Sequence, residues 1–95
     1  MGNYKISEEA ETDLERIWFY GLETWGLELA DQYHAAFFEH FEHLAEQPFL
    51  YPSVDDLRPG YRRSICGKDS VFYRMVGETV EIMAILGHQD QDRWL

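Results

Sequence analysis

The chain has 95 residues, of which 45% are hydrophobic and 16% aromatic, and its formal net charge is −10. This length suits one domain, residues 1–95, with one core, and the composition excludes an intrinsically disordered chain. No apolar run reaches the ~20 residues of a membrane span, and the N-terminus lacks a secretory signal, so we expect a cytoplasmic protein. The acidic balance argues against direct nucleic-acid binding, because proteins that bind phosphates are normally basic.

Charge is unevenly distributed along the sequence. Residues 1–48 hold eleven acidic and two basic residues, whereas residues 58–74 hold five basic residues and one acidic residue. The five basic residues are Arg58, Arg62, Arg63, Lys68 and Arg74. This segment is either a basic strand region beside a solvated acidic one or the contact site of an acidic partner.

The first half of the sequence predicts a short strand and two helices. Residues 4–6 form a strand-like run, and Ser7 is a candidate N-cap for a helix over residues 8–25. Gly26 breaks the pattern, and a second helix is predicted from residue 27 to about 47, where Pro48 ends it. The apolar stripes that face the core are expected to be Ala10, Leu14, Ile17, Trp18, Gly21 and Trp25, then Ala30, Tyr33, Phe37, Phe41 and Leu44.

The second half predicts a loop and three strands. Residues 49–59 contain two prolines and an acidic pair, which is typical of a loop. Strands follow over residues 61–66, 70–76 and 79–86, separated by glycine turns at 67–69 and 77–78. Alternation places Val80, Ile82, Ala84 and Leu86 on one face of the last strand. The predicted fold is α+β, in the order β-α-α-β-β-β, with a helical hairpin packed on one face of a small antiparallel sheet.

Several short sequence stretches, taken in this order, resemble the ParE toxins of the RelE/ParE superfamily. They are DLERIW at 13–18 with Tyr20 and Trp25-Gly26, LRPGYRR at 57–63, VFYR at 71–74, and VEI at 80–82 followed by ILG at 85–87. The resemblance implies a toxin that poisons DNA gyrase and is not itself an enzyme. It also implies a hetero-oligomer with a ParD-like antitoxin, whose C-terminal segment wraps the toxin and whose N-terminal part binds DNA. No cofactor is implied.

The residue pattern leaves two other functions open. A ribosome-dependent mRNA endonuclease of the RelE type would need an acid, a base and cations around the reacting phosphate. Arg62, Arg63, Arg74 and His88 could supply these groups, although the acidic residues at 90 and 92 would repel RNA. A non-toxic homologue that keeps only antitoxin binding is the other alternative.

Two further pairs of side chains carry weaker chemical interpretations. His40 and His43 have the i, i+3 spacing of a metal site, but this spacing more often belongs to a polar helix face, which is the interpretation we favour. Cys66 and His88 could form a nucleophile–base pair, but no third orienting group is evident and a buried free thiol is the simpler interpretation. We therefore expect no metal site and no catalytic residue.

The expected antitoxin-binding residues are two aromatics and four arginines. Phe19 and Phe38 lie off the predicted apolar stripes, so they either join an antitoxin groove between the hairpin and the sheet or belong to the core. Arg62 and Arg63 are strand neighbours that must point to opposite faces, and the sequence leaves open which one points outward. The proposed antitoxin site comprises Phe19, Phe38, Arg58, Arg62, Arg63 and Arg74.

Overall fold

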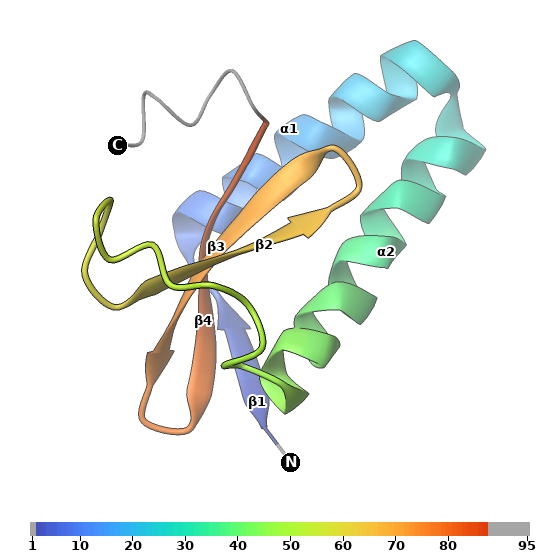
Figure 1. Ribbon diagram of the computed structural model, residues 1–95. Helices are drawn as coiled ribbons and strands as arrows, with labels where there is room; N and C mark the ends of the chain where they lie inside the picture. The colour runs from blue at the N-terminus through green and yellow to red at the C-terminus, as the bar shows by residue number, and fades with distance from the viewer. Residues whose placement is uncertain (1, 88–95) are drawn as a thin grey trace.

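The computed structural model describes residues 2–87, which form two helices and a four-stranded sheet (Figure 1). In chain order the elements are β1 (Asn3–Ile6), α1 (Glu8–Trp25), α2 (Leu27–Glu46), β2 (Tyr61–Cys66), β3 (Asp69–Val76) and β4 (Thr79–Gly87). This confirms the predicted α+β fold and its element order. Within residues 2–87, no helix combines the length and apolarity that crossing a membrane requires.

The helix ends follow the local signals in the sequence. The Ser7 side chain accepts a 3.1 Å hydrogen bond from the backbone N–H of Ala10, which confirms it as the N-cap of α1. Gly26 has a φ of 93°, and at this single residue the chain reverses between the two helices. Its N–H caps Leu22 at the end of α1, and its carbonyl accepts the first backbone bond of α2 from Ala30.

The sheet has the strand order β1-β4-β3-β2. Strands β2, β3 and β4 form the predicted antiparallel meander. Strand β1 pairs with β4 in parallel, so the sheet is mixed rather than wholly antiparallel. The parallel pair requires a long crossover between its strands, and the helical hairpin provides the first part of that connection.

β4 departs from the predicted alternation. A register shift between Phe72 and Tyr73 of β3 leaves Met83 of β4 as an extra residue. Val80 and Ile82 therefore face the helices, whereas Ala84 and Leu86 face the other way. The prediction that all four share one face was wrong, because a bulge inverts the alternation of every residue beyond it.

The sheet is hydrophobic on both faces. The helix-facing core joins the buried stripes of α1 and α2 to strand residues; its largest fully buried side chains are Phe37, Phe41, Leu44, Ile82, Ile85 and Tyr73. A smaller cluster on the opposite face contains Tyr61, Phe72, Ala84 and Leu86, with Val54 and Met83 packed against it. We call the face away from the helices the outer face of the sheet.

Helix α1 is attached to β4 through two side chains. Strand β1 ends at Ile6, so the edge of β4 beyond Ile82 lacks a neighbouring strand. Asp13 accepts a 2.9 Å hydrogen bond from the N–H of Ile85, and Arg16 donates a 3.0 Å bond to the Ile85 carbonyl. The two side chains thus satisfy both backbone groups of Ile85, as a neighbouring strand would. Burial raises the pKa of Asp13, and the hydrogen bond from Ile85 opposes that shift.

Helix α2 is attached to the other end of the sheet. His40 Nε2 forms a 2.7 Å hydrogen bond with the buried Ser64 hydroxyl on β2. Burial lowers the pKa of His40, which favours the neutral ring at neutral pH. The Tyr33 hydroxyl donates to Asp69 at 2.8 Å, and burial raises its pKa to about 12, so it remains a donor. These bonds fix the hairpin over β2 and the β2–β3 turn.

The contact between Asp13 and Ile85 gives a stability prediction. Asp13→Ala leaves the buried N–H of Ile85 without its acceptor, so the free energy of unfolding should fall by roughly 1–3 kcal/mol in urea titrations. Asp13→Asn keeps an acceptor and should cost less. Glu15→Ala, an exposed change on the same helix, is the control and should stay within about 0.5 kcal/mol. Equal losses for Asp13→Ala and Glu15→Ala would contradict this role.

Candidate protein-binding surfaces

The outer face of the sheet carries a row of one aromatic and three charged side chains across its four strands. Register places Tyr61, Arg74, Glu81 and Lys5 side by side on β2, β3, β4 and β1. Arg74 donates to Glu81 at 2.9 Å, and this hydrogen bond raises the pKa of the guanidinium. Lys5 lies 3.7 Å from the same carboxylate. The guanidinium of Arg74 also lies 5.9 Å from the centre of the Tyr61 ring.

Two more arginines border this row. Arg58 lies on the Tyr61 ring, 5.9 Å from its centre. Arg63 is the cross-strand neighbour of Phe72, so it points to the outer face. Within residues 2–87, no hydrogen bond or ion pair of the Arg63 guanidinium is found. It lines a pocket of about 460 Å³ at the outer edge of β2, together with Tyr51, Pro52, Val54, Ser64 and Ile65.

The remaining two cations of the basic segment point elsewhere. Arg62 faces the helix side, where it donates a 2.6 Å hydrogen bond to the Tyr51 carbonyl and lies 5.2 Å from the centre of the Phe49 ring. It therefore holds the loop before β2 rather than pairing with a helix carboxylate. Lys68, in the β2–β3 turn, lies 5.5 Å from the centre of the Trp25 ring. The structure thus separates Arg58, Arg63 and Arg74 from Arg62.

The two layers of the molecule carry opposite charge. Helices α1 and α2 together hold eleven acidic residues and one arginine. The outer face of the sheet presents four cations against Glu81, namely Lys5, Arg58, Arg63 and Arg74. An acidic partner is therefore attracted to the sheet side and repelled by the helix side.

The two predicted aromatic contacts lie in different environments. Phe19 is 55% exposed on α1 and packs edge-on against Trp18. Phe38 is half-buried at the margin of the helix-facing core, where its ring contacts Phe41 and His34. The expected open groove between hairpin and sheet is filled by the core. Phe19 and Phe38 therefore do not form one surface with the outer-face arginines.

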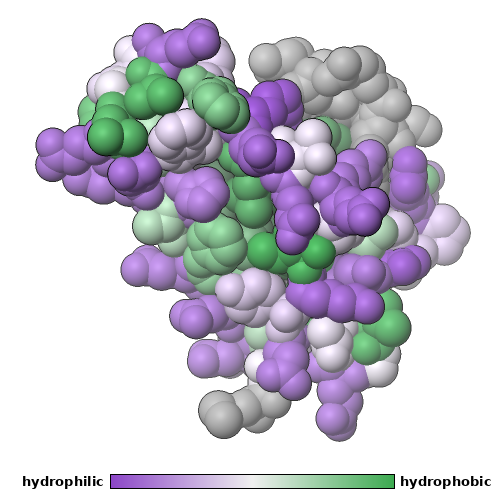
Figure 2. Space-filling view, turned by 180° about the vertical axis from the view of Figure 1, so that it is seen from behind, coloured by the Kyte–Doolittle hydropathy of each residue, from purple (hydrophilic) through white to green (hydrophobic). Residues whose placement is uncertain are grey.

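A second exposed surface lies at the end of the helical hairpin. Between Gly21 and Ala30 no residue is buried, so this end of the hairpin extends past the core. Figure 2 shows hydrophobic side chains gathered at this end, at the top left of the view. We call this the tip surface, and its exposed large hydrophobic residues are Phe19, Tyr20, Trp25, Leu27 and Leu29.

Helical periodicity does not predict most of the tip surface. It places Trp25 in the core because the residue continues the apolar stripe of α1, but Trp25 is 36% exposed and contacts Tyr20 and Tyr33. The apolar stripe of α1 continues as far as Trp25, but the sheet that covers the rest of the stripe ends before this residue. Leu27 and Leu29 lie off the apolar stripe of α2. This position is the sequence signal that would predict an exposed apolar pair.

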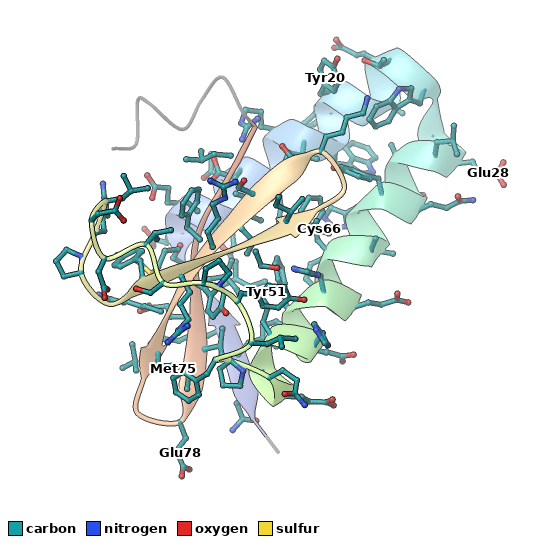
Figure 3. All side chains as sticks on the ribbon, in the orientation of Figure 1. Tyr20, Glu28, Tyr51, Cys66, Met75 and Glu78 are labelled. Carbon is teal, nitrogen blue, oxygen red and sulfur yellow. The ribbon has the colours of Figure 1, made fainter. Side chains whose placement is uncertain are left out.

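The structure places the cysteine and the histidine pair that were considered for catalysis and metal binding. Cys66, labelled in Figure 3, lies at the end of β2. Burial raises the pKa of its thiol to about 11, which keeps the thiol protonated and a poor nucleophile. Its suggested partner, His88, lies outside the described residues. His40 and His43 are adjacent, with ring centres 6.3 Å apart, but no group of three candidate metal ligands occurs within residues 2–87. What the described residues do provide is two surfaces suited to protein contacts.

Comparison with known proteins identifies the family. Residues 4–92 match the family described as the ParE toxin of the type II toxin–antitoxin system parDE. The chain is 40% identical over 92 residues to Toxin ParE1 of Caulobacter vibrioides, covering 97% of this chain and 94% of that protein. It is 34% identical over 90 residues to Toxin ParE1 of Mycobacterium tuberculosis, covering 94% and 91%.

A solved structure of the chromosomal ParDE toxin–antitoxin system from P. aeruginosa has the same fold. The TM-score is 0.77 at 25% identity, with 92% of this chain and 96% of that chain covered. The structural match includes the helical hairpin and the sheet, and the sequence match covers nearly the whole chain, so both support the same family. This protein is a member of the ParE toxin family of type II toxin–antitoxin systems.

Proposed function

We propose that this protein stops bacterial growth from the cytoplasm by poisoning DNA gyrase, and that a ParD-like antitoxin neutralises it by direct binding. The observation that carries the antitoxin part is the group of outer-face arginines on an otherwise acidic protein, with Arg63 lacking an ionic partner within residues 2–87. The gyrase part is supported by membership of the ParE family.

The antitoxin segment that binds the outer face should be acidic. Arginine suits this contact because its planar guanidinium can hold a carboxylate through two hydrogen bonds. Arg63 can bind an incoming carboxylate directly, whereas Arg74 is already bound to Glu81 and would have to exchange or share that partner. Of the arginines proposed as antitoxin contacts, Arg63 should therefore contribute most.

The pocket beside Arg63 would add an apolar contact. Its lining combines the Arg63 guanidinium with Tyr51, Pro52, Val54 and Ile65, and Ile65 is 61% exposed. An acidic residue next to an aliphatic residue in the antitoxin would match this lining. Reversing the direction of that segment, so that its acids lay on the helices, would set them against eleven carboxylates.

Arg62 and Phe38 remain proposed contacts of a different kind. Arg62 orders the loop that forms one wall of the Arg63 pocket, through the Tyr51 carbonyl. Phe38 supports the margin of the core. Both would influence antitoxin binding through the shape of the surface rather than through direct charge pairing.

The arginine assignment predicts faster antitoxin release. Arg63→Ala should raise the dissociation rate about tenfold or more at physiological salt, because truncating one member of a desolvated charge pair acts mainly on dissociation. Arg74→Ala should have a smaller effect. The change would leave Glu81 without Arg74 and able to repel the antitoxin carboxylate, but Arg63 would still bind that carboxylate. Surface plasmon resonance with the cognate antitoxin measures both rates.

The matched control is Lys68→Ala, which removes a cation of the same segment that lies on Trp25 rather than on the outer face. Its release rate should equal that of the wild type. If Arg58, Arg62, Arg63 and Arg74, each replaced by alanine, all release the antitoxin at the wild-type rate, the basic segment is only a solvated surface.

The activity assignment predicts DNA damage rather than mRNA cleavage. Induced expression without antitoxin should stop growth and induce the DNA-damage response. With purified gyrase, the protein should increase the amount of cleaved plasmid DNA, and added antitoxin should suppress that increase. Codon-specific mRNA cleavage in a translating extract would instead support the endonuclease alternative. Normal growth with intact antitoxin binding would support the non-toxic homologue.

A further inference from the structure

The tip surface has an unusual combination of exposed apolar and acidic groups. Half of the exposed large hydrophobic residues of residues 2–87 fall between positions 19 and 29. Isolated exposed leucines are common, but an apolar group of this kind rimmed by charge marks an interaction site. Tyr20 and Glu28, labelled in Figure 3, both project from this end of the hairpin.

The two helices pack closely where they cross, and the large apolar side chains of the tip lie outside that crossing. A Cβ placed on Gly21 would lie 3.3 Å from the Ala30 Cβ, so the helices approach closely at this point. No large side chain fits between them there, and the sheet offers no cover beyond the crossing. Phe19, Leu27 and Leu29 lie off the apolar stripes of their helices, and each is more than half exposed.

The tip surface also contains a groove. Trp25, Leu29, Gln32, Tyr33 and Ala36 line a pocket of about 380 Å³. The groove is shallow and open, so it suits an apolar side chain of a partner protein rather than an enclosed small ligand. The Trp25 and Tyr33 rings meet edge-to-face with centres 5.8 Å apart, which gives the groove a rigid aromatic wall.

The charge around the groove defines the chemistry of the partner. Residues 15–31 contain Glu15, Glu23, Glu28 and Asp31 with Arg16 as their single cation. Lys68 of the β2–β3 turn adds a second cation beside Trp25, so four carboxylates stand against two positive charges. An acidic antitoxin segment that suits the outer-face arginines would be repelled here. A surface that presents an apolar side chain flanked by lysine or arginine would be attracted, and enzymes that act on DNA carry such basic surfaces because they bind phosphates.

We propose that the tip surface is where this toxin binds its cellular target, through a basic, DNA-binding surface of that target that inserts an apolar side chain beside Trp25. This inference rests on the proposed function. It assigns target binding and antitoxin binding to different residues. A second copy of this chain is a poorer occupant in a tip-to-tip arrangement, because two acidic tips repel each other.

The test compares target and antitoxin binding of the same variants. Leu27→Gln with Leu29→Gln removes exposed apolar surface while keeping good helix formers. Its affinity for purified gyrase should fall about tenfold or more, its growth inhibition should fall in parallel, and its antitoxin affinity and thermal midpoint should be unchanged. Val76→Gln, at a 45% exposed residue of β3, is the control and should bind gyrase as the wild type does.

A charge reversal tests the chemistry of the partner separately. Glu23→Lys places a cation in the last turn of α1, where the helix dipole favours it, so the fold is retained. It should weaken gyrase binding and reduce the dependence of that binding on salt. Unchanged or tighter binding would overturn the proposal of a basic partner surface.

The other outcomes distinguish the tip proposal from the proposed function. If the wild type does not bind gyrase, the proposed target is wrong, and the tip proposal that rests on it fails too. If the wild type binds and the double leucine variant binds equally well, only the tip proposal fails. A parallel loss of antitoxin affinity would assign the tip to the antitoxin. Loss of a concentration-dependent dimer would assign it to self-association.

Discussion

The bonds from Asp13 and Arg16 to the two backbone groups of Ile85 are the constraint on which the rest of this structure depends. Strand β4 pairs with both β1 and β3, but β1 is too short to cover its full length. Without α1, the N–H and carbonyl of Ile85 would lie unpaired beside a hydrophobic core, which is costly. Their pairing fixes α1 against the β4 edge and commits the hairpin to one face of the sheet. The opposite face is thereby left for the arginines.

The two binding proposals rest on the resulting division of charge. The outer face suits an acidic segment near Arg63, and the tip surface suits a basic one near Trp25. The two surfaces meet at the β2–β3 turn, where Lys68 lies on Trp25 and Tyr33 donates to Asp69. An antitoxin that follows β2 toward this turn would reach the margin of the tip. In that position it would obstruct the target by its bulk, even though the two proposals place the partners on different side chains.

Local signals were enough to predict the elements, but not the features that depend on pairing between strands. Ser7 and Gly26 placed the ends of α1, and the same residues cap it in the structure. The bulge at Met83 has no local signature, because it is a mismatch of register between β3 and β4. The sequence required Arg62 and Arg63 to point in opposite directions, but only the packed sheet shows that Arg63 points outward. The tip surface was missed for the same reason, since periodicity cannot show where a supporting sheet ends.

Methyl NMR of the labelled toxin tests most directly whether the antitoxin lies on the outer face of the sheet, as proposed. Ile65 and Met83 report on the outer face, whereas Leu27 and Leu29 report on the tip. Titration with the unlabelled antitoxin segment should shift the methyl resonances of Ile65 and Met83 most strongly. Shifts concentrated at Leu27 and Leu29, with Ile65 and Met83 unchanged, would contradict this account.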